Sequence, residues 1–116
     1  MPNPKMEGPF PFTRDDVDRR ITKHQAGNYV LGRKNAIGKF VPEYVGRSDS
    51  DVNTRLKDHL PEYYTYFMFR YATSPKDAFE CECRYYHTLG GKDCLDNKMH
   101  PDLPDDSKKW KCPVCE

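Results

Sequence analysis

A run of aromatic side chains constrains the fold of this chain more than any other feature of the sequence. Residues 63–71 read YYTYFMFRY, in which only Thr65, Met68 and Arg70 interrupt the rings. A nearly continuous apolar run is typical of a strand that lies inside a sheet and is buried on both faces. The run therefore predicts a central strand against which the other elements pack.

A helix is predicted before this strand. Residues 48–51 read SDSD and offer several N-caps. Val52, Leu56 and Leu60 then recur at a spacing of four residues, which predicts one buried face on an amphipathic helix. Pro61 should end this helix after about twelve residues.

A second helix is predicted after the strand. Ser74 is its expected N-cap, and Pro75 takes the first helical position, where the missing N–H costs no hydrogen bond. Two glycines, Gly90 and Gly91, should end it.

The N-terminal region predicts an extended arm followed by a short helix. Residues 1–12 contain four prolines, and we expect the rings of Phe10 and Phe12 to contact the core. Thr13 is the expected N-cap of the helix, which should end near Gly27.

Two shorter strands are predicted between these helices, over residues 28–32 and 39–46. Residues 33–38 are largely polar, close with a glycine and predict a hairpin loop. Pro42 limits the second strand to an edge or an irregularity of the sheet. The order of elements predicts an α+β domain with a small, mostly antiparallel, three-stranded sheet flanked by helices.

The length of 116 residues is that of one domain. We expect three parts: an arm with a short helix over residues 1–24, a core over residues 25–90, and a tail over residues 91–116 that packs on the core. The tail has little periodicity and few apolar anchors, so it needs a further stabilising interaction.

The composition excludes a membrane-spanning protein and narrows the possible partners. Only 36% of the residues are hydrophobic and 32% are charged, and no apolar stretch approaches the length of a membrane span. The N-terminus lacks the apolar run of a signal peptide, which predicts a cytoplasmic protein. Since the net charge is only +1, nucleic-acid binding would require a local basic patch. The candidates for such a patch are Arg33, Lys34, Arg47 and Lys57.

Tyrosine-containing tripeptides stand on both of the shorter predicted strands. They are Gly27-Asn28-Tyr29 and Tyr44-Val45-Gly46, and Arg47-Ser48-Asp49 follows the second. Arg55 and His59 lie four residues apart on the next predicted helix, so both project from one face.

An acidic residue on the last predicted helix completes the pattern. Glu82 follows Ala78 by four residues, and Asn97 comes after the helix. In this order and spacing the chain resembles the GIY-YIG nuclease superfamily over residues 25–97. It departs from the family pattern at Asn28, where an aliphatic residue is usual, and has a longer segment between the tripeptides.

The resemblance implies a GIY-YIG endonuclease fold and a metal-dependent DNA endonuclease that hydrolyses a phosphodiester bond. Glu82 would bind Mg²⁺ or Mn²⁺, which neutralises charge on the phosphate and the departing oxygen. Arg55 would hold the phosphate oxygens. Tyr29 would help to activate the attacking water, and Tyr44 and His59 would position it. The expected substrate is double-stranded or branched DNA.

Two other functions fit the same residues. The chain can be a nucleic-acid-binding module that keeps the fold without activity, or a zinc-containing adaptor for other proteins. In the adaptor the tyrosines are structural.

The cysteines predict a structural zinc site in the tail. Cys112 and Cys115 stand three positions apart, a spacing at which two thiolates close a turn around one tetrahedral ion. A reducing compartment also favours metal binding over disulfides. Two further ligands are needed, and we favour a pair on the last predicted helix because a helix holds both in fixed geometry. The favoured pair is Cys83 with His87, and the alternative is Cys94 with His100.

Overall fold

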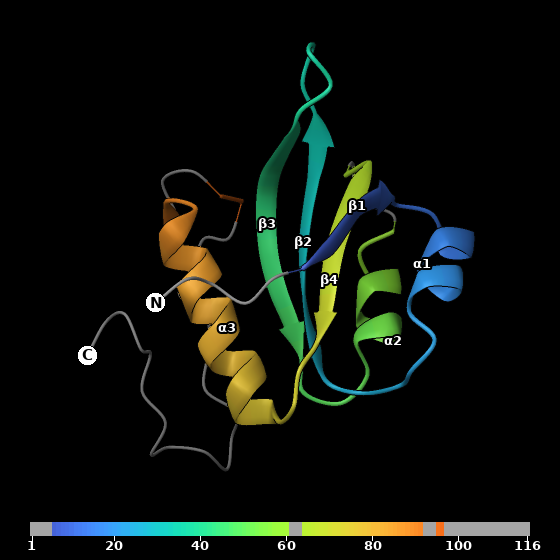
Figure 1. Ribbon diagram of the computed structural model, residues 1–116, viewed down its shortest axis with the longest axis vertical. Coiled ribbons are helices and arrows are strands. Elements are labelled where there is room, and N and C mark those ends of the chain that lie inside the picture. Colours follow the sequence, from blue (N-terminus) through green and yellow to red (C-terminus); the bar gives the residue numbers. More distant parts are fainter. Residues whose placement is uncertain (1–5, 61–63, 92–94, 97–116) are drawn as a thin grey trace.

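The computed structural model describes residues 6–60, 64–91 and 95–96. It contains a four-stranded sheet in the order β1-β4-β2-β3, in which every neighbouring pair is antiparallel (Figure 1). The strands are β1 (Glu7–Pro11), β2 (Gly27–Lys34), β3 (Phe40–Ser48) and β4 (Tyr66–Tyr71). The helices are α1 (Arg14–Arg20), α2 (Val52–Lys57) and α3 (Pro75–Thr88). The predicted α+β class is confirmed.

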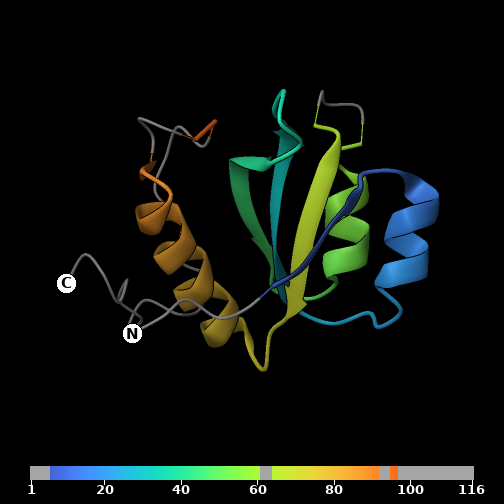
Figure 2. The same cartoon turned by 45° about the horizontal axis from the view of Figure 1, so that its top comes forward.

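The helices cover both faces of the sheet. Helices α1 and α2 lie side by side on one face, and α3 lies alone on the other (Figures 1 and 2). Side chains along β2 alternate between the two sides, as a pleated strand requires. Tyr29 and Leu31 belong to the core under α1 and α2, whereas Val30 belongs to the core under α3. This alternation decides which side chains can reach a shared site.

The larger core lies between the sheet and helices α1 and α2. Phe67 and Phe69 of β4 are buried there against Val17 of α1 and Leu56 of α2. The smaller core, under α3, includes Val45 of β3. Among the described residues, no helix has the length and apolarity that crossing a membrane requires.

The aromatic run forms an interior strand, as predicted. Strand β4 begins at Tyr66 and lies between β1 and β2. Its Phe67 and Phe69 are fully buried, but Met68 and Arg70 on the other side are only half-buried. Helix α3 packs on β2 and β3, so it leaves this side of β4 partly uncovered.

The prediction of three strands is wrong, because the N-terminal arm forms a fourth. Residues 7–11 pair with β4 as an edge strand, with a register shift between Glu7 and Phe10. Two prolines in five residues hid this strand, since proline cannot donate to a sheet and is tolerated only at edges and bulges. The arm does bring Phe12 into the core, as expected from the sequence.

Strand β3 carries the expected irregularity at Pro42. Its register with β2 shifts there, between the pairs Leu31–Tyr44 and Gly32–Pro42. Both strands extend further than predicted, so the loop shortens to residues 35–39. The Asn35 side chain closes it by accepting hydrogen bonds from the backbone N–H groups of Ile37 and Lys39.

The helix starts are confirmed, and two helix ends differ from the prediction. Thr13 and Ser74 are the N-caps of α1 and α3. Helix α1 ends at Arg20, well before Gly27, because Ile21 is extended. Helix α2 spans six residues instead of about twelve.

The residues after α2 form tight turns. The backbone N–H groups of His59 and Leu60 donate to carbonyls three residues earlier, as in a 3₁₀ turn. His59 therefore leaves the helical path and lies against the sheet.

The first prediction tests the arm as part of the core. Replacement of Phe12 by Ala should lower the free energy of unfolding by about 3 kcal/mol, because a ring that is 7% exposed leaves a cavity. Chemical denaturation measures this change. The control is Ile37→Ala, which truncates a side chain that is 85% exposed and should change the same quantity by less than about 0.5 kcal/mol. Equal effects of the two changes would place Phe12 outside the core.

Candidate functional site

A cleft of about 500 Å³ opens beside the end of β3. Residues 46–51 form its floor and rim, where β3 ends and the chain turns toward α2. Tyr29 and Tyr44 line it from the sheet, Arg55 from α2 and Glu82 from α3. The structure therefore brings four of the five predicted catalytic residues to one concave surface.

The Tyr29 ring lies directly over Gly46 on the neighbouring strand. These two residues are opposite each other in the β2–β3 register. A Cβ atom added to Gly46 would overlap the Cζ and hydroxyl atoms of Tyr29. The glycine of the second tripeptide thus provides the space that the tyrosine of the first one occupies. It is a packing requirement that sequence spacing alone did not reveal.

The fifth predicted catalytic residue, His59, packs against both tyrosines. Its Nε2 atom shares a hydrogen bond of 2.8 Å with the Tyr29 hydroxyl. Its ring centroid lies 5.0 Å from that of Tyr44 and 5.4 Å from that of Tyr29. The two tyrosine rings are stacked, with centroids 6.5 Å apart. His59 is buried and so supports the cleft wall instead of lining it.

Burial and the nearby positive charge shift the pKa of the Tyr29 hydroxyl in opposite directions. Burial raises its pKa, and the nearby phenol of Tyr44 raises it further, since a buried phenolate is poorly solvated. The Arg55 guanidinium works against this through its charge and a side-chain hydrogen bond. The net effect is a pKa well above the ordinary value, so Tyr29 holds its proton at neutral pH.

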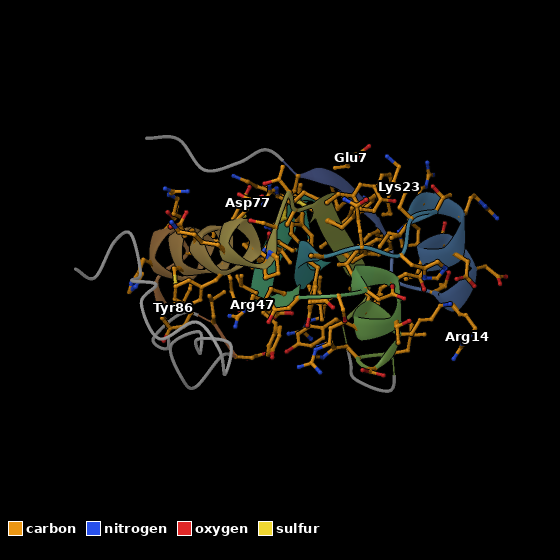
Figure 3. All side chains as sticks on the ribbon, turned by 90° about the horizontal axis from the view of Figure 1, so that it is seen from below. Glu7, Arg14, Lys23, Arg47, Asp77 and Tyr86 are labelled. Atoms are coloured by element: carbon orange, nitrogen blue, oxygen red, sulfur yellow. The ribbon has the colours of Figure 1, made fainter. Side chains whose placement is uncertain are left out.

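Arg47 joins β3 to α3 across the cleft. Its Nη1 atom donates to Glu82 Oε1 at 2.5 Å, and its Nε atom donates to Asp49 Oδ1 at 3.1 Å. The guanidinium also lies over the Phe79 ring, 5.2 Å from its centroid. Figure 3 shows Arg47 at the end of the sheet beside α3. Burial opposes its charge, but the carboxylates of Glu82 and Asp49 raise its pKa, so Arg47 stays charged.

The other predicted nucleic-acid-binding residues lie outside the cleft. Arg33 makes a bidentate ion pair with Glu43 near the hairpin, with both contacts at 2.8 Å. Lys34 lies over the Tyr66 ring, 4.5 Å from its centroid.

Lys57 faces the first helix instead of the cleft. Its Nζ atom is 2.5 Å from Asp18 Oδ1 on α1. The structure thus places Arg47 alone of the four predicted basic residues in the cleft.

The Glu82 carboxylate is a donor of the kind that hard divalent ions use, and in this structure it is paired with Arg47. Mg²⁺ is usually held by one or two carboxylates together with water and substrate phosphates. The described residues contain no group of three or more His, Cys, Asp or Glu that could hold a metal ion by itself. An ion at Glu82 would therefore take further ligands from water and from the substrate.

The zinc site stays a prediction. Cys83 is fully buried on α3 and contacts Phe79, and His87 is half-buried one turn later. Cys112 and Cys115, as well as the alternative pair Cys94 and His100, lie outside the described residues, as does Asn97.

The part of the tail at residues 95–96 does pack on the core. Leu95 is buried in the core under α3. Asp96 accepts a hydrogen bond of 2.7 Å from the Tyr64 hydroxyl, and its backbone N–H donates to the carbonyl of Glu43.

Sequence analysis missed the acidic side of the cleft. Asp49, Asp51 and Asp58 line it, yet residues 48–51 were interpreted as N-caps and as part of the family pattern, and not as an acidic wall. Asp51 is indeed the N-cap of α2, and its side chain accepts from the Thr54 N–H. Three acidic residues within the ten positions 49–58, shortly after Arg47, were the signal that could have indicated a polar cleft.

Comparisons of this chain with protein-family models, with curated proteins and with solved structures find no match.

The second prediction concerns Gly46. Its replacement by Ala should lower the free energy of unfolding by about 1–3 kcal/mol, because the new methyl group overlaps the Tyr29 ring. In a Tyr29→Ala background the same change should cost at least about 1 kcal/mol less, as a double-mutant cycle measures. Additive effects would show that the two residues do not compete for space.

The third prediction concerns alkaline pH. Above the ordinary tyrosine pKa of about 10, the unfolded chain loses the Tyr29 proton while the folded chain keeps it, so stability falls. The free energy of unfolding of the wild type, minus that of Tyr29→Phe, should decrease by about 1 kcal/mol between about pH 9 and about pH 11. Urea denaturation across this range measures the difference. A constant difference would contradict a raised pKa at Tyr29.

Proposed function

We propose that the protein is a metal-dependent DNA endonuclease of the GIY-YIG type. The observation that carries the proposal is the convergence of Tyr29, Tyr44, Arg55 and Glu82 on one cleft. They come from β2, β3, α2 and α3, and packing alone does not require these four side chain types at one opening. Their identities are those that the sequence resemblance assigns to phosphodiester cleavage.

The two arginines that line the cleft suit the anionic oxygens of a phosphodiester, and a divalent ion would offset the four carboxylates beside them. Arg55 is exposed on α2, and its planar guanidinium can hold two phosphate oxygens at once. Arg47 at the opposite wall is paired with Glu82 and Asp49, so it would bind a phosphate oxygen only as these pairings rearrange. When bound at Glu82, a divalent ion would neutralise charge on the phosphate and on the departing oxygen.

Tyr29 and His59 supply a route for the proton of the attacking water. A protonated phenol is a poor base, and burial makes the Tyr29 phenol poorer still. In the tautomer of His59 that leaves Nε2 unprotonated, Nε2 can accept the Tyr29 proton through their hydrogen bond. The Tyr29 oxygen then takes a proton from water as its own proton passes to His59. Tyr44 stacks on Tyr29 and restricts the position of its ring.

The fourth prediction tests this proposal on Glu82. Glu82→Gln keeps the shape of the side chain but removes its charge, so Mg²⁺-dependent nicking of supercoiled or branched DNA should fall at least about a hundredfold. Arg55→Ala should cause a loss of similar size through the phosphate. Gel-based cleavage assays measure both, and circular dichroism checks the folding of each variant.

The matched control is Glu80→Gln. Glu80 stands on the same helix but does not line the cleft, so nicking by this variant should remain at the wild-type level. DNA binding without cleavage by the wild type would instead favour an inactive binding module with the same fold. Equal cleavage by wild type and Glu82→Gln would overturn the assignment of the site.

A further inference from the structure

A fully buried asparagine joins strand β2 to α3. Asn28 stands in β2 directly before Tyr29, and its side chain points to the opposite side of the sheet, toward α3. Its Nδ2 atom donates a hydrogen bond of 2.8 Å to the backbone carbonyl of Ala78. Its Oδ1 atom accepts one of 2.8 Å from Nη1 of Arg70 on β4. Both polar ends of the buried amide are thus satisfied, as burial demands.

Arg70 extends this connection to the first turn of α3. Its Nη2 atom donates to Asp77 Oδ2 at 2.7 Å, and the same oxygen accepts from the Thr73 backbone N–H at 2.9 Å. Figure 3 labels Asp77 on this first turn. A polar network therefore runs from β2 through β4 into α3, and fully satisfied networks of this kind restrict packing to one arrangement.

The Ala78 carbonyl gives this network its relation to the cleft. In an α-helix the carbonyl of residue 78 accepts from the N–H of residue 82. Asn28 thus binds the carbonyl that begins the turn carrying Glu82. One residue further along β2, Tyr29 faces the opposite side of the sheet and lines the cleft. A single dipeptide of β2 therefore contacts both walls of the site.

We propose that Asn28 and Arg70 are positioning residues that fix the Glu82 carboxylate relative to the Tyr29 hydroxyl. The inference rests on the proposed function, because Glu82 must bind a divalent ion for its position to affect catalysis. An aliphatic residue at position 28, as the GIY-YIG pattern has, would bind neither the Ala78 carbonyl nor the guanidinium. In this chain a hydrogen bond from Asn28 fixes the first turn of α3 on β2. With an aliphatic residue at this position, apolar packing alone would fix it.

The fifth prediction uses Mn²⁺ as the probe and the full chain as the sample. Electron paramagnetic resonance of free Mn²⁺ gives the Kd of the wild type and its variants. Asn28→Leu and Asn28→Asp should each raise this Kd about tenfold, the size of effect seen when groups that orient a metal ligand are lost. The Asp variant keeps an acceptor for Arg70 and replaces the donor to Ala78 by a carboxylate oxygen, which repels that carbonyl. It covers the case in which the Leu variant does not fold.

Asn53 provides the matched control. It is a buried asparagine on α2, and its Nδ2 atom also donates to a backbone carbonyl, that of Ile21, at 2.9 Å. Asn53→Leu should lower thermal stability but leave the Mn²⁺ Kd within about twofold of the wild type, because it lies on the other face of the sheet. A Kd within twofold of the wild type in both Asn28 variants, or an equal rise in Asn53→Leu, would overturn the proposal.

A second measurement separates this proposal from the proposed function. Amide hydrogen exchange, followed by NMR, reports directly on the Glu82 N–H. Relative to the mean rate of the sheet amides, which corrects for overall stability, this N–H should exchange about tenfold faster in both Asn28 variants and at the wild-type ratio in Asn53→Leu. If the wild type does not bind Mn²⁺, or if Glu82→Gln binds it equally well, the proposed function fails. The exchange rates then still decide whether Asn28 fixes this turn of α3, and unchanged rates would contradict it.

Discussion

The packing of the Tyr29 ring against Gly46 is the contact on which the cleft depends. Tyr29 and Gly46 are directly opposite each other in the β2–β3 register, near the end of the sheet. With a side chain at Gly46 the ring could not lie there, and the hydrogen bond to His59 would lose its partner. The Arg55 guanidinium reaches the same hydroxyl from α2. One missing Cβ atom therefore permits a phenol, an imidazole and a guanidinium to meet.

The two arginines of the cleft lie among four carboxylates, those of Asp49, Asp51, Asp58 and Glu82. Arg47 is held by Glu82 and Asp49, so the positive charge nearest α3 is already compensated. A phosphate entering beside Arg55 would redistribute these pairings instead of meeting a bare positive surface. Under the proposed function, such a site would gain selectivity from its geometry, since a net charge of only +1 draws little nucleic acid to the protein from a distance.

Local signals in the sequence predicted the parts of the fold that depend on neighbouring residues. The caps at Thr13 and Ser74 and the irregularity at Pro42 follow from chemistry within a few positions. Strand β1 was missed because its pairing with β4 is a long-range contact that outweighs the poor strand propensity of its prolines. The role of Asn28 could not be read either, since its partner Arg70 stands 42 residues away.

The prolines of the outer strands have a consequence for the behaviour of the sheet in a crowded solution. An outer strand with unpaired backbone groups can add a strand from another molecule, which is a common start of aggregation. Here β1 contains Pro9 and Pro11 and shifts register, and β3 is interrupted at Pro42. Neither outer strand offers an unbroken ladder of donors to an incoming chain. The same residues that weaken these strands as local structure thus protect the molecule against self-templated assembly.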